Sequence, residues 1–422
     1  MADAAQFSSP RGSTPFLTRL ESLRGVAAMT VAIGHSFRVF QTDGAQAIAS
    51  TWIDRVFNGN AAVTLFFVLS GYVLGLSLRH APELSARSMG SFGLRRFFRI
   101  YPVFLLATLV VLGCLWCSRR FEWPLPAWFG SADGYRSSVL HPRGLPDATT
   151  IFYNLVLWSP SLNQVTWTLG IELRCSVLLP LLHWWSGKLS LRGRSVLLLG
   201  LVFLACLPKW CLLLGSPPAE TVASIFHGAF SGFLFLFYLG YLLPELGAAL
   251  FNRINGSALR WLFPWLPLVI FLGADRWGDE LRILQGAAAA GIIGHLLYGT
   301  EHRVHQWLDA PLARFYGRIS YSFYLWHDLV LIVLARTMAH FVPKTVLAPG
   351  ALAFGGLVLL ASVAITTGIA ALCFRWVERP FVDWSKRITA RHGRRSNIAT
   401  IAASDMSPLP PEQKSPPPAK AA

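Results

Sequence analysis

About ten apolar runs, each nearly as long as the hydrocarbon core of a bilayer is thick, constrain the fold most. Unpaired backbone groups are too costly in lipid for open strands, so such runs form helices. The chain is 54% hydrophobic and only 14% charged, which is typical of membrane proteins rather than soluble ones. We therefore predict an all-α, polytopic integral membrane helical bundle with about ten transmembrane helices. The runs lie at about residues 18–40, 60–78, 100–118, 165–186, 195–215, 222–243, 260–274, 281–299, 318–338 and 349–374.

The positions of the cations predict how this bundle is oriented. The chain has 37 Lys and Arg against 21 Asp and Glu. With the N-terminus inside, cations of the inside segments outnumber those outside by about three to one. This distribution accounts for the basic charge better than nucleic-acid binding does, and it places both termini in the cytoplasm. Residues 1–15 do not resemble a cleavable signal peptide, so we expect the first run to remain as a helix.

Two polar tails are expected to flank the membrane domain. Residues 1–16 form a polar N-terminal tail, and residues 17–384 contain all the apolar runs. Residues 385–422 begin with a basic stretch and continue as a Pro-, Ser- and Ala-rich segment without apolar periodicity, which is typical of disorder. Glu378, Arg379 and Pro380 are expected to end the last helix. The six cysteines suggest neither a zinc site nor a disulfide framework, and we expect no metal.

The first apolar run carries two ionisable residues, Arg24 and His35. Eleven residues of helix make three turns plus 20°, so the two share one face, about 16 Å apart along the axis. Thr18 and Glu21 suggest a capping box at the start of this helix. Ionisable side chains at membrane depth usually face a bundle interior or a wet cavity. The alternative is a snorkelling arginine and a histidine satisfied by a backbone carbonyl.

Polar residues also interrupt the second and fourth runs. In FFVLSGY, Ser70 and Gly71 either permit close helix packing or face a ligand channel. In VTWTLGIE, Trp167 and Glu172 lie within an apolar helix. A carboxylate at this position would either orient an imidazole from another helix or serve as the structural partner of an arginine such as Arg24.

The motif RRFFRIYP precedes the third run and contains Arg96, Arg99 and Tyr101. The two arginines share one side of a helical turn. They either set the topology and bind lipid phosphates or bind a phosphate-bearing cytoplasmic cofactor. The ninth run begins with SYSFYLWH, in which Tyr324 precedes His327. Its aromatic residues suggest an interfacial belt, and His327 is either a cavity residue or an interface residue.

Together these motifs resemble acyltransferase family 3, which includes bacterial O-antigen and exopolysaccharide O-acetyltransferases. LESLRGVAAMTVAIGHS, FFVLSGY, RRFFRIYP, WTLGIE, SYSFYLWH and VERPF follow in the family's order over about residues 17–384. The resemblance implies an O-acyltransferase of the inner membrane. It would transfer an acyl group, usually acetyl from cytoplasmic acetyl-CoA, to a hydroxyl of an envelope glycan or a lipid-linked sugar. The chain departs from the family's pattern after Glu172, where Leu173, Arg174 and Cys175 follow.

The resemblance also implies roles for individual residues. Arg24 and His35 match the family's essential pair, and Arg96 and Arg99 match its paired arginines. We expect the arginines to hold the CoA phosphates, the pantetheine arm to lie along the first helix, and His35 to act as general base or, less favourably, to carry the acyl group. The predicted catalytic residues are His35, Arg24 and Glu172, the cofactor-binding residues are Arg96, Arg99, Ser70 and Tyr101, and the substrate-binding residues are Trp167, His327 and Tyr324.

Some relatives carry a fused hydrolase-like domain that completes the transfer outside. We therefore expect this chain either to complete the transfer itself or to rely on a separate partner. Two other classes of protein fit the same residues. One is a proton-coupled transporter in which Arg24, His35 and Glu172 form a path across the membrane. The other is a non-catalytic membrane sensor or scaffold, which would have no need of cations suited to phosphate.

Overall fold

The computed structural model describes residues 13–38, 56–79, 85–121, 146–213, 231–261, 264–273, 281–347 and 351–389. These residues form helices and no strands, which confirms the all-α prediction for this part of the chain. The long helices are α1 (Ser13–Arg38), α4 (Gly59–Arg79), α5 (Ala86–Arg120), α8 (Trp167–Gly187), α9 (Leu191–Leu213), α11 (Ser231–Asn255), α13 (Arg282–Tyr298), α15 (Pro311–Phe341) and α17 (Ala351–Cys373). The shorter ones include α7 (Ala148–Leu155), α12 (Trp265–Gly273), α14 (Arg303–Leu308) and α16 (Lys344–Leu347).

Four helical stretches of the described chain are long and apolar enough to cross a membrane. They are Gly59–Arg79, Ser88–Ser118, Gln164–Gly187 and Ala353–Thr389. Helices α1 and α15 have 26 and 31 residues, so they also have the length to cross. Their sequences contain the charged and polar residues discussed below, which lowers their mean hydropathy.

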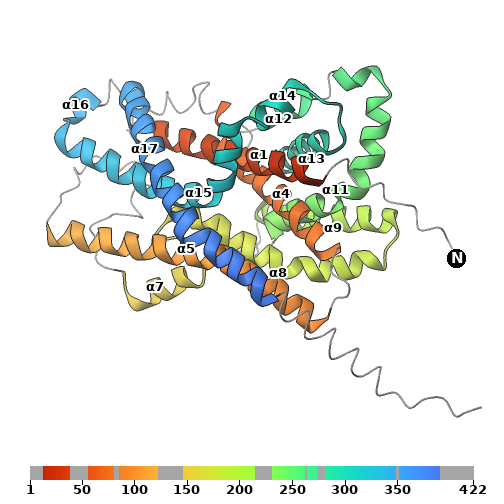
Figure 1. Cartoon of the computed structure of the whole chain (residues 1–422), viewed down its shortest axis with the longest axis horizontal. Coiled ribbons are helices and arrows are strands. Elements are labelled where there is room, and N and C mark those ends of the chain that lie inside the picture. Colours follow the sequence, from red (N-terminus) through yellow and green to blue (C-terminus); the bar gives the residue numbers. More distant parts are fainter. Residues whose placement is uncertain are drawn as a thin grey trace, which may run out of the picture.

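Helix α15 packs against both α1 and α17, and the three helices lie together in the same part of the molecule (Figure 1). Every residue from Ile319 to Ile332 is buried. A helix that is buried all round belongs to the core. The interpretation of SYSFYLWH as an interfacial belt is therefore wrong: Tyr321, Tyr324 and Trp326 pack inside the protein.

Two glycines allow α4 and α11 to pack closely. A Cβ atom on Gly71 would lie 2.0 Å from the carbonyl oxygen of Phe237, and one on Gly240 would lie 2.0 Å from that of Val68. Small residues at such crossings let helix backbones approach within a membrane. The packing interpretation of Gly71 is therefore confirmed. The neighbouring Ser70 lines a cavity on another side of α4.

Helices α1 and α15 meet in a similar way. A Cβ atom on Gly25 would lie 2.6 Å from the backbone of Gly317, and one on Gly317 would lie 2.6 Å from the backbone of Glu21. This contact fixes the helix that carries Arg24 and His35 against the helix that carries His327.

A charged cluster joins α4, α9 and α11 at one end. Glu245 of α11 accepts hydrogen bonds from Arg79 of α4 at 2.6 Å and from Arg194 of α9 at 2.5 Å. Its side chain is only 9% exposed. The guanidinium of Arg79 also lies 4.4 Å from the ring centre of Tyr241. One carboxylate thus compensates two cations where three helices converge.

The bounds of the first and last helices differ from the predicted ones. In the described chain α1 begins at Ser13, so Thr18 already lies inside the helix and the predicted capping box is wrong. After α17, residues Phe374–Glu378 form a π-helical turn, and the helix then continues to residue 389. The prediction that Glu378–Pro380 ends the helix is therefore wrong, because the wider turn accommodates the missing N–H of proline.

The predicted tails lie mostly outside the described residues. Residues 13–16 and 385–389 are helical, whereas 1–12 and 390–422 are not described. The sequence also predicts a long external loop at about residues 119–150, of which 122–145 lie outside the described residues.

Candidate active site

The two arginines of RRFFRIYP each face a carboxylate. Arg96 of α5 donates a hydrogen bond to Glu172 of α8 at 2.5 Å, and Arg99 lies 3.6 Å from Glu378. Glu378 is brought inward by the π-helical turn and is buried, with its side chain 1% exposed. Its second carboxylate oxygen accepts a hydrogen bond from Ser322 Oγ at 2.7 Å. Buried carboxylates need such partners because the loss of hydration is costly.

Glu172 and Arg24 line the same cavity, between α1, α4, α8 and α15. The cavity has a volume of about 30 Å³ and is also lined by Ser70, Tyr321 and Tyr324. Ser70 Oγ donates to Glu172 at 3.3 Å. The Nε atom of Arg24 is buried without a hydrogen-bond partner among the described residues. Such an unsatisfied buried donor is expensive and is typical of a place where a ligand or water binds.

The charges around this cavity do not cancel. Arg24 interacts electrostatically with two arginines and two glutamates. Three guanidinium groups therefore face two carboxylates, which leaves one positive charge in excess. An anionic ligand would balance it. The members of this group are Arg24, Arg96, Arg99, Glu172 and Glu378.

A second polar group lies further along α1. His35 Nδ1 is 3.3 Å from Nε2 of His327 and 3.8 Å from Oδ1 of Asp328. His327 is fully buried and the Asp328 side chain is 1% exposed, whereas His35 is 20% exposed. His35 is thus the most exposed member of this trio. Arg24 and His35 both lie beside residues of α15, which is consistent with the prediction that they share one face of α1.

The hydrogen bonds of the trio determine where the protons lie. His327 Nδ1 is 2.6 Å from the carbonyl oxygen of Tyr324, which can only accept, so this nitrogen carries a hydrogen. In the neutral ring, Nε2 of His327 is then the acceptor, and Nδ1 of His35 donates to it. Nε2 of His35 is therefore the basic nitrogen. Asp328 lies close enough to stabilise a positive charge on His35 once that nitrogen has taken a proton.

Tyr324 connects the two polar groups. Its ring lines the charged cavity, its hydroxyl accepts a hydrogen bond from Thr168 at 3.1 Å, and its carbonyl holds His327. The charged cavity and the histidine pair thus lie at successive levels along α1 and α15.

Other predicted residues lie further from this arrangement. Trp167 packs against Phe67 and Phe233, so it stands behind the cavity wall that Phe67 forms. Tyr101 stacks on Phe97 of its own helix with ring centres 4.4 Å apart and is not among the residues that line the cavity.

Two carboxylates near the site were not predicted to act there. Asp328 directly follows His327 in a buried helix, and an acid at that depth was a usable signal. Glu378 was interpreted as part of a helix end. Glu172, expected either to orient an imidazole or to pair with an arginine, contacts Arg96, while Asp328 lies beside the imidazole.

Comparison with known proteins identifies the family of the chain. The chain matches the model of acyltransferase family 3, described as an acyltransferase domain, over residues 17–370. It is 24% identical over 403 residues to the membrane-bound transacylase BcsY of Komagataeibacter xylinus, which covers 91% of this chain and 88% of that protein. It is 31% identical over 184 residues to the acyltransferase MdmB of Streptomyces mycarofaciens, covering 42% of this chain and 43% of that protein. No solved structure matches. The chain belongs to acyltransferase family 3 and is a membrane-bound acyltransferase.

Proposed function

We propose that this acyltransferase moves an acyl group, most simply acetyl, from cytoplasmic acyl-CoA to a hydroxyl of an envelope glycan or a lipid-linked sugar. The observation that carries the proposal is the order of polar groups along α1. A cavity with excess positive charge at Arg24 is followed by a basic nitrogen of His35. A thioester donor with an anionic end and a thin arm matches that order. The alternatives of a transporter or a scaffold have no support from the family.

In the proposed reaction His35 acts as general base. Its Nε2 takes the proton of the acceptor hydroxyl while that oxygen attacks the acyl carbonyl. The carbon–sulfur bond then breaks, and the protonated imidazole returns the proton to the leaving thiolate. Asp328 stabilises the imidazolium between these two steps, and His327 keeps the ring of His35 in the required tautomer. His327 is fully buried, so we assign it this orienting role rather than contact with the acceptor.

The donor would occupy the charged cavity only in part. A volume of about 30 Å³ holds one or two water molecules, far less than a nucleotide. We therefore place the nucleotide outside the cavity and only a narrow portion of the donor within it. Arg96 and Arg99 are already paired with carboxylates, so they would share their charge with the donor, whereas Nε of Arg24 still needs an acceptor. Ser70 lines the route, and Tyr101 is a weaker candidate because it stacks away from the cavity wall.

The membrane arrangement is part of the proposal. About ten spans, both termini in the cytoplasm and an inner-membrane location would put the arginine end of α1 inside the cell and His35 closer to mid-membrane. Trp167 and Tyr324 remain proposed substrate-binding residues, Tyr324 in the wall of the charged cavity and Trp167 behind that wall. A separate partner that completes transfer outside the membrane is compatible with this orientation.

Membrane vesicles supplied with radiolabelled acetyl-CoA test the proposal. Label should enter an envelope fraction with the wild type and not with His35→Ala, while the exposed His340→Ala serves as a matched control that keeps activity. The double variant Arg96→Ala, Arg99→Ala should raise the KM for the donor. Transfer retained by His35→Ala would exclude His35 as the base. If the folded wild type released no CoA from acetyl-CoA or from any longer acyl-CoA, the assignment of acyl-CoA as the donor would be refuted.

A further inference from the structure

A second cavity lies on another side of α1. It has a volume of about 240 Å³ and is enclosed by α1, α4, α12, α13 and α14. Its walls are almost entirely apolar, and the polar side chains among its lining residues are those of Thr30, His295 and His302. A cavity of this size and lining suits a hydrocarbon ligand.

This apolar cavity is separate from the candidate active site, and the two share no lining residue. On α1, Leu23, Val26 and Thr30 border the apolar cavity, about a third of a turn away from Arg24 and His35. Helices α1 and α4 contact each other, and each contributes residues to both cavities. A molecule in the apolar cavity would therefore support α1 without taking part in acyl transfer.

The mouth of the cavity has the character of a membrane interface. Trp265 and Trp307 line it and are 52% and 57% exposed. Tryptophans prefer the headgroup level of a bilayer. On the outer side of α12, Leu266 and Val269 are also exposed, as expected of side chains that face lipid. The cavity therefore opens sideways into the bilayer, close to its surface.

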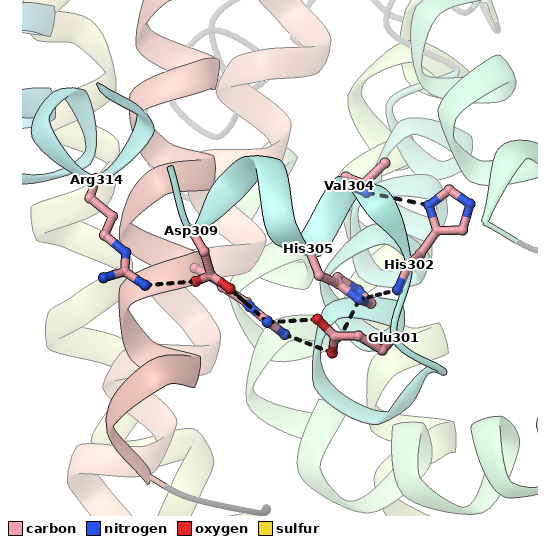
Figure 2. A network of polar contacts seen from close by, with 7 residues as sticks. Glu301, His302, Val304, His305, Asp309 and Arg314 are labelled. Atoms are coloured by element: carbon pink, nitrogen blue, oxygen red, sulfur yellow. Dashed lines mark hydrogen bonds and ion pairs between the residues drawn. The ribbon is translucent and has the colours of Figure 1, made fainter. Parts of the chain in front are cut away.

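The polar residues beside the mouth leave a cation available. Arg19 donates to Glu301 and to Asp309 at 2.7 Å each. Arg314 donates to Asp309, as Figure 2 shows. Both acids are thus neutralised, and the same network ties α14 to α1. Arg303 lies between the lining residues His302 and Val304, is exposed, and has no ion pair among the described residues. An anionic headgroup would complement it.

We propose that this cavity seats one hydrocarbon chain of an anionic phospholipid, with the phosphate beside Arg303 and His302. The stretch from Leu23 to Thr30 would give the chain roughly 10 Å of contact along α1. The bound lipid would brace α1, which carries Arg24 and His35, against α12–α14. The inference does not rest on the identity of the acyl donor or acceptor.

Photocrosslinking tests the lipid site on the purified full chain in nanodiscs. The probe is phosphatidylglycerol with a diazirine in one chain, compared with the matching phosphatidylcholine, and labelled peptides are identified by mass spectrometry. Label is expected in the peptides that contain Leu23–Thr30 and the lining part of α13. Leu268→Trp, which fills the cavity from α12, should abolish it. Leu266→Trp, on the outer side of the same helix, should retain it.

The variant Arg303→Gln tests the proposed contact between Arg303 and the lipid phosphate. The preference for phosphatidylglycerol should fall about fivefold, as expected for the loss of one cation worth about 1 kcal/mol at an anionic surface. Equal labelling of wild type and Leu268→Trp would overturn the proposal, and so would equal labelling by the two lipids in the wild type. Displacement of the label by a long-chain acyl-CoA would assign the cavity to the donor and also refute it.

Discussion

Replacing Gly71 with alanine tests whether the close contact of α4 with α11 holds the charged cavity in place. The new Cβ atom would lie 2.0 Å from the carbonyl oxygen of Phe237 and 2.6 Å from two further backbone atoms of that residue. Carbon and oxygen atoms normally approach no closer than about 3.3 Å. The two helices must therefore separate by more than 1 Å, roughly the difference between these distances. No rotamer change relieves the clash, because every opposing atom belongs to the backbone.

The expected loss of stability follows from two opposing contributions. Overpacking a well-packed core costs about 1–3 kcal/mol, and the upper end applies where backbone meets backbone. Alanine is favoured over glycine inside a helix by about 0.5–1 kcal/mol. The net destabilisation should therefore be about 2 kcal/mol. Ser70 should move away from Glu172 with the displaced helix, so acyl transfer should fall as well.

The assay compares thermal unfolding in detergent and acyl transfer for Gly71→Ala with those for Gly113→Ala in α5. A Cβ atom on Gly113 would have no neighbour within 4 Å, so that variant should be as stable as wild type or slightly more stable. Equal melting temperatures for the two variants would refute the argument from close packing. Normal melting with lost transfer in Gly71→Ala would show that the cavity, and not the helix contact, is the sensitive feature.

Three further changes probe other parts of the structure. Asp328→Asn should lower kcat about 10²–10³-fold with KM nearly unchanged, because it removes the charge that stabilises protonated His35 only during the reaction; an effect confined to KM would contradict this role. Glu245→Gln leaves two arginines without their shared carboxylate and should cost about 3 kcal/mol, measured by thermal unfolding. The hydrogen bond from Arg19 lowers the pKa of Asp309 below its usual 3.8. The ion pair therefore contributes to the free energy of unfolding above pH 3.8, and this contribution is lost as the pH falls through the lowered pKa. Asp309→Asn should therefore be less stable than wild type near neutral pH, and the difference should shrink on acidification below about pH 4 in melting experiments; a constant difference would exclude the ion pair as its source.

Local periodicity predicted part of this site and could not predict the rest. The helical repeat alone placed Arg24 and His35 on one face, because that geometry involves a single helix. The partner of His35 depends on which helix packs against that face, and 292 residues separate His35 from His327 in the sequence. Several arginines could have formed an ion pair with Glu172, and only the packing of α5 against α8 selects Arg96.

The end of the last helix shows another limit of local reasoning. Arg379 and Pro380 favour a helix stop on propensity, yet the chain continues as a helix through a π-helical turn. The carboxylate of Glu378 faces Arg99 and Ser322, contacts that repay the irregular turn and come from distant elements. Local signals do not contain that information.

The wide separation of the site residues in the sequence has a consequence for how the protein is made. During synthesis α1 enters the membrane with Arg24 and His35 long before α15 and the turn that carries Glu378 exist. Ionisable side chains within a membrane helix are costly without partners, so α1 is unstable in the bilayer on its own. Its final position becomes favourable only when α15 arrives. Chains that stop before residue 378 should therefore be inactive and be recognised by membrane quality control, so that acyl transfer begins only in a fully synthesised protein.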